Sequence, residues 1–112
     1  MKQSRNVKIQ VYVPLSHAKK VRLAIGDAGG GHVGKYSHCV FVTEGTGYFL
    51  PLKGANPHIG HVGKIQSVRE AKIEFICTAS KAAKIIKAIK RVHPYEEVAL
   101  DVIPLVDDLM ND

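Results

Sequence analysis

The sequence predicts an α+β fold, a ferredoxin-like βαββαβ sandwich in which a four-stranded antiparallel sheet carries two helices on one face. Three observations predict it. Several short segments alternate apolar and polar residues, as half-buried strands do, and two segments repeat apolar residues at helical spacing. These segments follow the order strand, helix, strand, strand, helix, strand. Two right-handed βαβ halves in this order form such a sheet.

The first strand and the first helix follow one another directly. Apolar residues alternate with polar ones over residues 7–13, and Pro14 ends this predicted strand. Ser16 is predicted to cap a helix whose apolar residues recur at helical spacing over residues 18–28. The glycines Gly29–Gly31 are expected to end that helix.

The middle of the chain predicts a strand followed by a long loop. An extended pattern runs from Tyr36 to Glu44, with His38 and Cys39 on opposite faces, before residues 45–47 (Gly-Thr-Gly) interrupt it. Residues 52–63 contain three glycines and a proline without apolar periodicity. Because long loops in small domains are usually functional or mobile, this loop is a candidate functional segment.

The last third predicts a strand, the clearest helix of the chain and a final strand. The alternating pattern of Val68–Cys77 predicts the strand. Ser80 is predicted to cap a helix with an apolar stripe over residues 82–89 and basic residues on the opposite face. The final strand covers residues 98–103 and is expected to end at Pro104.

The uncovered face of this sheet predicts a partner. It is expected to carry Val, Ile, Phe and Tyr side chains, and exposed apolar patches of that size usually mark an interaction. Symmetric self-assembly is the simplest arrangement that covers it.

Length and charge set the class of protein. The 112 residues predict a single domain, 1–112, with an acidic C-terminal tail at residues 106–112. Sixteen Lys and Arg residues against ten Asp and Glu residues give a net charge of +6. A basic surface favours anionic partners in general, although an ordinary solvated surface is the simpler interpretation.

Targeting signals are not evident. No apolar run approaches the ~20 residues that a membrane helix needs, so no membrane span is expected. The first six residues lead directly into a predicted strand without an apolar signal region. Cys39 and Cys77 do not form a disulfide framework, which agrees with a cytoplasmic location.

Six histidines raise the hypothesis of a metal site. His58 and His61 lie three residues apart on a glycine-rich loop, but two ligands do not complete a zinc shell. His93 and Glu97 project together if their segment is extended, and a histidine with a carboxylate suits zinc, copper or a related divalent ion. The alternative for each histidine, His38 included, is a surface or hydrogen-bonded side chain.

Other chemistries find little support. The sequence contains no GxSxG, no Walker lysine and no HExxH, and Cys39 is expected to be buried. Residues 29–34 (GGGHVG) could present backbone N–H groups to an anion. Nucleic acid is not expected as a partner, because most aromatic residues fall in the buried strand pattern. Those aromatic residues are Tyr12, Phe41, Tyr48, Phe49 and Phe75.

Two long motifs resemble one family. The stretch GHVGKYSHCVFVTEGTGYFLPLKGANPHIGHVGKI, from Gly31 to Ile65, and HPYEEVALDVIPL, from His93 to Leu105, resemble the inserted central domain of YqfO-type, Ngg-interacting-factor-like dinuclear-metal proteins. These are also known as GTP cyclohydrolase I type 2 homologues. In long members the domain interrupts a hydrolase-like body that holds two metal ions. The flanking ligand motifs are not found here, so the resemblance implies a stand-alone insert domain without the hydrolase activity.

The resemblance also implies a PII/CutA-like fold, because the inserted domain is similar to the PII signalling proteins and the CutA divalent-cation-tolerance proteins, both homotrimers. HPYE resembles the CutA C-terminal region. VTEGTG, from Val42 to Gly47, is similar to the strand that leads into the PII T-loop, so residues 45–63 would be the counterpart of that loop.

The favoured function is therefore a non-enzymatic, homotrimeric PII/CutA-like binding or signalling protein. Its site would lie between subunits and bind a divalent metal (zinc or copper) or a small anion, and the loop would report the ligand to a protein partner. The expected ligand-binding residues are Gly31, His32, Tyr36, Ser37, His38, Glu44, Gly45, Thr46, Gly47, His93, Tyr95, Glu96 and Glu97. The expected metal ligands are His38, His58, His61, His93 and Glu97.

Two alternatives remain open at this point. One is an enzyme or accessory subunit related to the GTP cyclohydrolase I type 2 homologues. The other is a structural trimer that docks on another protein.

Overall fold

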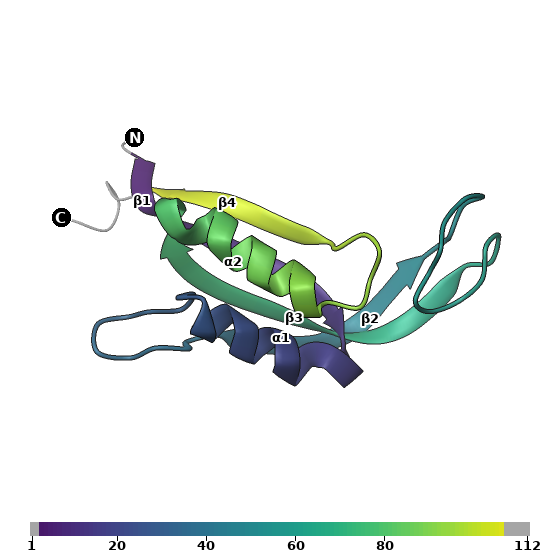
Figure 1. The fold of residues 1–112 in the computed structure, drawn as a ribbon, viewed down its shortest axis with the longest axis horizontal. Helices are drawn as coiled ribbons and strands as arrows, with labels where there is room; N and C mark the ends of the chain where they lie inside the picture. The colour runs from purple at the N-terminus through teal and green to yellow at the C-terminus, as the bar shows by residue number, and fades with distance from the viewer. Residues whose placement is uncertain (1–2, 107–112) are drawn as a thin grey trace.

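A computed structural model describes residues 3–106 of the chain and shows one sheet covered on one face by two helices (Figure 1). The elements follow the predicted order, and the predicted fold class is confirmed. The strands are β1 (Gln3–Pro14), β2 (Phe41–Phe49), β3 (Gln66–Thr78) and β4 (Leu100–Val106). The helices are α1 (Leu15–Asp27) and α2 (Ala79–Val92).

The sheet has the order β2-β3-β1-β4, with antiparallel pairing between all neighbours. Alternation in the two central strands sends one set of side chains toward the helices. Ile9 and Val11 of β1 and Ile73 of β3 are fully buried there, against Ile25 of α1 and Ile85 of α2. The predicted core stripes of both helices and both central strands are thus confirmed.

The other face of the sheet has no covering layer and is of mixed character. Phe41, Ile76 and Ile103 lie on it and are 69%, 42% and 38% exposed. Between them, Lys8 Nζ lies 3.1 Å from Glu74 Oε1. The open face therefore combines exposed apolar side chains on β2, β3 and β4 with a charged pair between β1 and β3.

Several predicted boundaries are wrong. Strand β2 begins at Phe41 rather than Tyr36, because His38 adopts a positive φ of 60° and turns the chain before it. His38 and Cys39 therefore precede the strand and do not lie on opposite faces of it as predicted, and Cys39 is only half-buried. The aromatic rings of Phe41 and Tyr48 are 69% and 72% exposed rather than buried.

Pro14 ends β1 as predicted, but the Gly45–Gly47 segment and Pro104 do not end their strands. The Gly45–Gly47 segment stays within β2, since Gly45 and Gly47 pair in register with Glu70 and Val68. Pro104 lies within β4, which is an edge strand, where a missing N–H is tolerated.

The helix caps also differ from the prediction. Helix α1 begins at Leu15 and α2 at Ala79, and neither has a side-chain cap. The hydroxyl of Ser16 contacts His17 Nδ1 and that of Ser80 contacts Thr78 Oγ1, so both expected caps use their side chains elsewhere.

Strands β2 and β3 continue past the helices as a two-stranded arm that ends in the loop of residues 50–65 (Figure 1). The turn of residues 28–40 lies at the opposite end of the molecule, and the corner of residues 93–99 lies at the arm end (Figure 1). No helix among residues 3–106 is long and apolar enough to cross a membrane. Of the predicted acidic tail, residues 107–112 fall outside the described part of the chain.

Candidate ligand-binding groove

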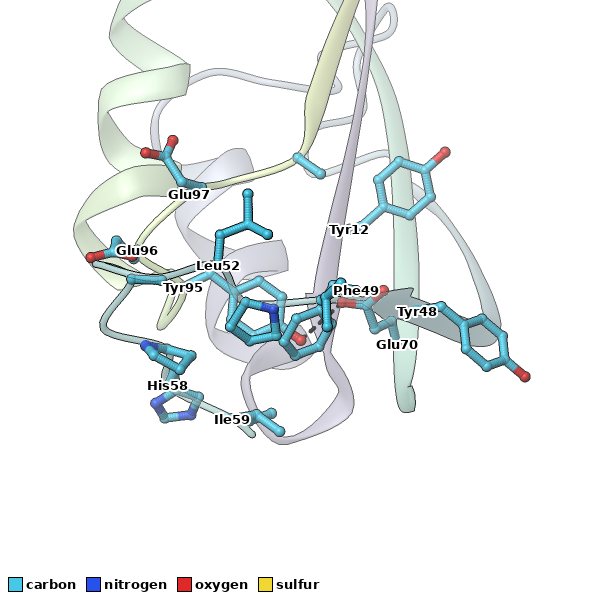
Figure 2. A pocket seen from close by; sticks show the side chains of 15 residues that line it. Tyr12, Tyr48, Phe49, Leu52, His58, Ile59, Glu70, Tyr95, Glu96 and Glu97 are labelled. Carbon is cyan, nitrogen blue, oxygen red and sulfur yellow. Dashed lines mark hydrogen bonds between the residues drawn. The ribbon is translucent and has the colours of Figure 1, made fainter. Parts of the chain in front are cut away.

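A groove of about 690 Å³ lies where the arm loop meets the corner between α2 and β4, and we call it the loop groove. Figure 2 shows its side chains, which come from both segments and from the neighbouring strands. Its lining residues are Tyr12, Tyr48, Phe49, Leu50, Pro51, Leu52, Ala55, Pro57, His58, Ile59, Glu70, Tyr95, Glu96, Glu97 and Ala99. The walls are thus aromatic and apolar, and the charged groups are three glutamates.

Tyr95 is the central side chain of the loop groove. Its hydroxyl donates a hydrogen bond of 2.9 Å to Glu70 Oε2 (Figure 2). Its ring lies against the rings of Phe49, His58 and His93, with centroids 6.3, 6.4 and 5.0 Å away. Burial raises the pKa of the Tyr95 phenol, and the hydrogen bond and charge of Glu70 raise that pKa further. The phenol therefore stays protonated at neutral pH and serves as a donor rather than a base.

Gly47 makes room for this hydrogen bond. A Cβ at position 47 would overlap the Glu70 carboxylate. Because Glu70 and Gly47 both face the open side of the sheet, the missing side chain lets the carboxylate lie over β2 and reach Tyr95.

His93 attaches the corner of residues 93–99 to strand β1. It is 7% exposed, its Nε2–H donates to the Tyr12 carbonyl oxygen at 2.7 Å, and its Nδ1 accepts from the Tyr95 backbone N–H at 3.1 Å. Since the carbonyl can only accept and the amide can only donate, this is the neutral Nε2–H tautomer. Burial lowers the pKa of His93, and the Tyr12 carbonyl and Glu70 partly oppose that effect.

Two backbone contacts attach the arm loop to its surroundings. The N–H of Asn56 donates to Glu96 Oε1 at 3.2 Å, which joins the loop to the corner. The N–H of Gly63 donates to the Pro51 carbonyl at 2.9 Å, which closes the loop at its base. Glu96 is therefore engaged within the protein, whereas Glu97 is exposed and makes no hydrogen bond or ion pair with another described residue.

Comparisons with known proteins identify the domain. No family model matches the chain. The GTP cyclohydrolase 1 type 2 homolog of Bacillus subtilis is 48% identical over 98 residues, which are 88% of this chain and 26% of that protein. The solved Bacillus cereus protein related to NIF3 is 48% identical with a TM-score of 0.80, and the match covers 94% of this chain and 27% of that one.

This chain is a homologue of the inserted PII/CutA-like domain of those NIF3-related proteins. It spans about a quarter of the length of the curated relatives it matches. The recognition made from the two sequence motifs is thus confirmed.

More distant solved structures show the fold alone. The periplasmic divalent cation tolerance protein CutA of Archaeoglobus fulgidus has a TM-score of 0.64 at 19% identity over 89% of this chain and 83% of that one. Bacillus subtilis GlnK has a TM-score of 0.60 at 17% identity over 91% of this chain and 86% of that one. The PII/CutA-like fold is therefore shown, and the ligands of those proteins are not transferred by it.

The PII/CutA-like domain does not bring all its predicted site residues together. The segment of residues 31–38 lies at the far end of the sheet from the corner of residues 93–97 (Figure 1). Within one copy they cannot form one site. Of the predicted residues, Tyr95, Glu96, Glu97 and His58 line the loop groove, and His93 supports it.

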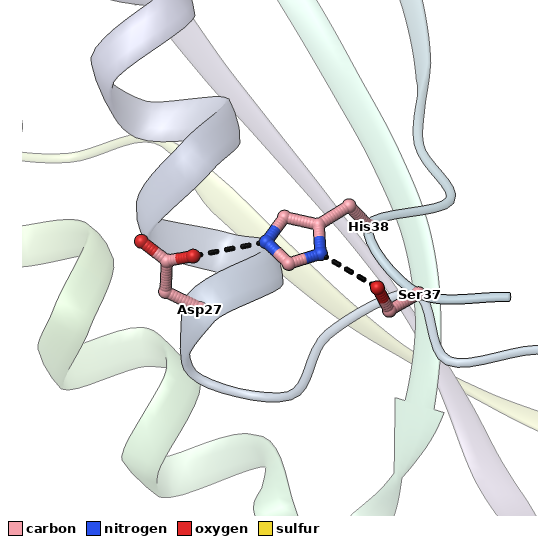
Figure 3. Close-up of polar contacts among 3 residues, drawn as sticks. All are labelled: Asp27, Ser37 and His38. Atoms are coloured by element: carbon pink, nitrogen blue, oxygen red, sulfur yellow. Dashed lines mark hydrogen bonds and ion pairs between the residues drawn. The ribbon is translucent and has the colours of Figure 1, made fainter.

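At the far end, His38 joins its turn to helix α1 (Figure 3). Its Nε2–H donates to Asp27 Oδ1 at 2.9 Å, and its Nδ1 lies 2.9 Å from the Ser37 hydroxyl. The ring occupies the space that a side chain at Gly26 would need. This Ser-His-Asp contact is exposed and anchors the turn of residues 28–40.

The three consecutive glycines at residues 29–31 use their backbone N–H groups within the fold. The N–H groups of Gly29, Gly30 and Gly31 donate to the carbonyls of Gly26, Ile25 and Ile76. His32 in turn contacts the carbonyl of Gly34 at 2.9 Å. The backbone N–H groups of Gly29, Gly30 and Gly31 therefore already have partners within the protein and are not available to an anion in this structure.

The predicted metal ligands also do not converge. Within residues 3–106, no group of three or more His, Cys, Asp or Glu side chains is placed to hold a metal ion. His38 and His93 each have both ring nitrogens in hydrogen bonds, and His61 lies outside the groove lining. His58 contacts the rings of His17 and Tyr95. One copy of the domain therefore does not supply a complete metal shell from its described residues.

Sequence analysis missed Glu70, Tyr12 and the aromatic wall of Tyr48 and Phe49. Glu70 could have been found from strand alternation, which places it on the open face of β3, where it pairs with Gly45 in the middle of β2. Its contact with Tyr95 joins residues 25 apart and depends on a register that the sequence does not reveal.

Proposed function

We propose that this PII/CutA-like domain acts by binding rather than by chemistry, as a homotrimer whose loop groove holds a small ligand and whose arm loop signals that the ligand is present. The observation that carries the proposal is that the loop itself forms one wall of the groove, while the corner of residues 95–99 forms the other. A ligand that touches both walls favours the loop position in which both contacts are made.

The lining favours one chemical class of ligand. Its charged residues are Glu70, Glu96 and Glu97, and it contains no Lys or Arg. An anion would meet like charges there. Aromatic walls with carboxylates suit a flat organic molecule that offers hydrogen-bond donors or a positive charge, and the exposed Glu97 carboxylate is the group left to accept from it. A divalent metal would need further ligands from a neighbouring copy.

The open face of the sheet supports self-assembly. Phe41, Ile76 and Ile103 are exposed on it, and a symmetric partner would cover them. The charged pair of Lys8 and Glu74 at its centre would fix how the copies align across such an interface.

Two measurements test the proposal. Light scattering is expected to give three times the chain mass of 12.2 kDa. Titration calorimetry with guanosine, GTP, ATP, zinc and copper is expected to show guanosine binding more tightly than GTP, because the triphosphate meets the glutamates. Glu97→Gln should weaken that binding about tenfold, since it removes a charge-assisted hydrogen bond. Glu44→Gln, which changes an exposed glutamate outside the groove, is the matched control.

Three results would overturn the proposal. A particle mass of 12.2 kDa would show that the chain is a monomer rather than a trimer. Failure of every probe to bind below about 1 mM would remove the ligand site. Turnover of GTP with a divalent metal that His93→Ala or His38→Ala abolishes would show catalysis instead.

A further inference from the structure

The two helices carry a strongly positive net charge. Three cations on α1 and five on α2 make up half of the sixteen Lys and Arg residues of the chain. They are Lys19, Lys20, Arg22, Lys81, Lys84, Lys87, Lys90 and Arg91. Helix α2 contains no acidic residue, and Asp27 is the only one in α1. The positive charge is thus concentrated on the side of the sheet opposite the open face.

A second groove, of about 700 Å³, runs between α1 and α2, and we call it the helix groove. Alanines line it on both sides, with Ala24 of α1 and Ala28 just after that helix facing Ala83 and Ala88 of α2. Small side chains keep the groove open and would let another backbone come close.

Lys84, Lys87 and Arg91 form one edge of the helix groove. Their spacing of three and four residues places them on one stripe of α2, about 10 Å long. All three are exposed, and no carboxylate in the described part of the chain lies within ion-pair distance of them. Asp27, which also lines the groove, is held by His38 at 2.9 Å.

From this geometry we infer that the helix groove docks an acidic helix of a partner protein. On a helix with carboxylates three and four residues apart, the carboxylates have the same spacing as the three cations of α2, so each cation can form an ion pair with one carboxylate. The alanine floor allows the close helix spacing of about 8 Å. Nucleic acid is less suited, because neither α1 nor α2 contains a Phe, Tyr or Trp on which a base could stack.

The inference does not rest on the proposed function. The helix groove and the open face lie on opposite sides of the sheet, so assembly through the open face would leave the helix groove accessible (Figure 1). The loop groove shares no lining residue with it. Either site can therefore fail while the other binds.

Fluorescence anisotropy of the full chain with a labelled, stapled peptide of about 15 residues tests the inference. The peptide carries Glu on one helical stripe at three- and four-residue spacing. The triple variant Lys84→Gln, Lys87→Gln, Arg91→Gln is expected to bind about tenfold more weakly. The matched control Lys35→Gln, Lys53→Gln, Lys64→Gln removes the same charge from exposed loop positions and should change affinity less than about twofold.

A further variant separates groove docking from general attraction. Ala83 is exposed and lines the groove, so Ala83→Leu fills it without a change in charge or core packing. It should also weaken binding of the peptide several-fold. Any of four results would overturn the inference. Two concern the variants: equal losses of affinity from the two triple variants, or no effect of Ala83→Leu on peptide binding. The other two concern the probes: equal binding of a peptide with scrambled Glu positions, or tighter binding of a single-stranded oligonucleotide through the same cations.

Discussion

The two grooves of this domain have nearly the same volume and opposite chemistry. The loop groove is lined by glutamates and aromatic rings, and residues far apart in the sequence meet in it. The helix groove is lined by alanines and cations from the surfaces of two helices. Long-range hydrogen bonds fix the shape of the loop groove, whereas the helix groove follows from the packing of α1 beside α2 alone. The difference indicates that substitutions of the hydrogen-bonded residues around the loop groove should affect stability, whereas substitutions in the helix groove should affect only recognition.

The largest expected effect comes from His93→Leu, which removes two buried hydrogen bonds of the corner at similar volume. It should lower the free energy of unfolding by about 2–3 kcal/mol, because the Tyr12 carbonyl and the Tyr95 N–H lose their partner. Urea denaturation measures it, with the exposed His61→Leu as a control that should stay within about 0.5 kcal/mol. Equal losses in both variants would contradict the role of His93.

The pH dependence of stability should follow from the same histidine. Burial lowers the pKa of His93 in the folded state, so the unfolded chain takes up the proton first as the pH falls. Stability from this group is therefore complete above the unfolded pKa of about 6.5 and is lost as the pH falls through the lower folded value. Unfolding free energies measured from about pH 7.5 to about pH 5 should show this loss. In His93→Gln the decline should be smaller, and an unchanged slope would contradict the assignment.

A smaller effect is expected from Tyr95→Phe. The variant removes the hydrogen bond to Glu70 and should cost about 1 kcal/mol, since Glu70 is only half-buried and water can partly replace the phenol. Tyr48→Phe is the matched control, because its ring is 72% exposed and it has no recorded hydrogen bond among the described residues. Thermal unfolding should separate the two variants, and identical midpoints would show that the Tyr95 hydroxyl contributes nothing.

The smallest effect should come from the helix groove. Lys84→Gln, Lys87→Gln, Arg91→Gln relieves like-charge repulsion at three- and four-residue spacing and should leave stability unchanged or raise it by up to about 0.5 kcal/mol. Urea denaturation checks it. A marked loss of stability would mean that these cations hold the fold together and are not free for a partner.

The fold was predictable because its main signals are local. The alternation of Val7 to Val13 and the apolar stripe ending at Ile89 each follow from one segment, and the structure buries both. The predictions that Gly47 and Pro104 end strands are wrong, because the effect of each residue depends on the strand beside it. Gly47 pairs with Val68 within β2, and the Glu70 carboxylate fills the space that a side chain there would need. Pro104 is tolerated in β4 because that strand is at the edge of the sheet.

The candidate site was only partly predictable for the same reason. The HPYEE motif marked the corner, and the glycine-rich loop marked the wall opposite to it. Which residues they meet depends on the register between β2 and β3 and on the turn at His38, and no single segment encodes these. The predicted site therefore combined residues from both ends of the molecule.

Helix α2 ends at Val92, and the next residue is the histidine that supports the corner. Arg91 at one groove and His93 under the other are thus separated by a single residue. A small tilt of the last helical turn would move both at once. The last turn of α2 therefore contributes Arg91 to the helix groove and leads directly into the residue that supports the loop groove.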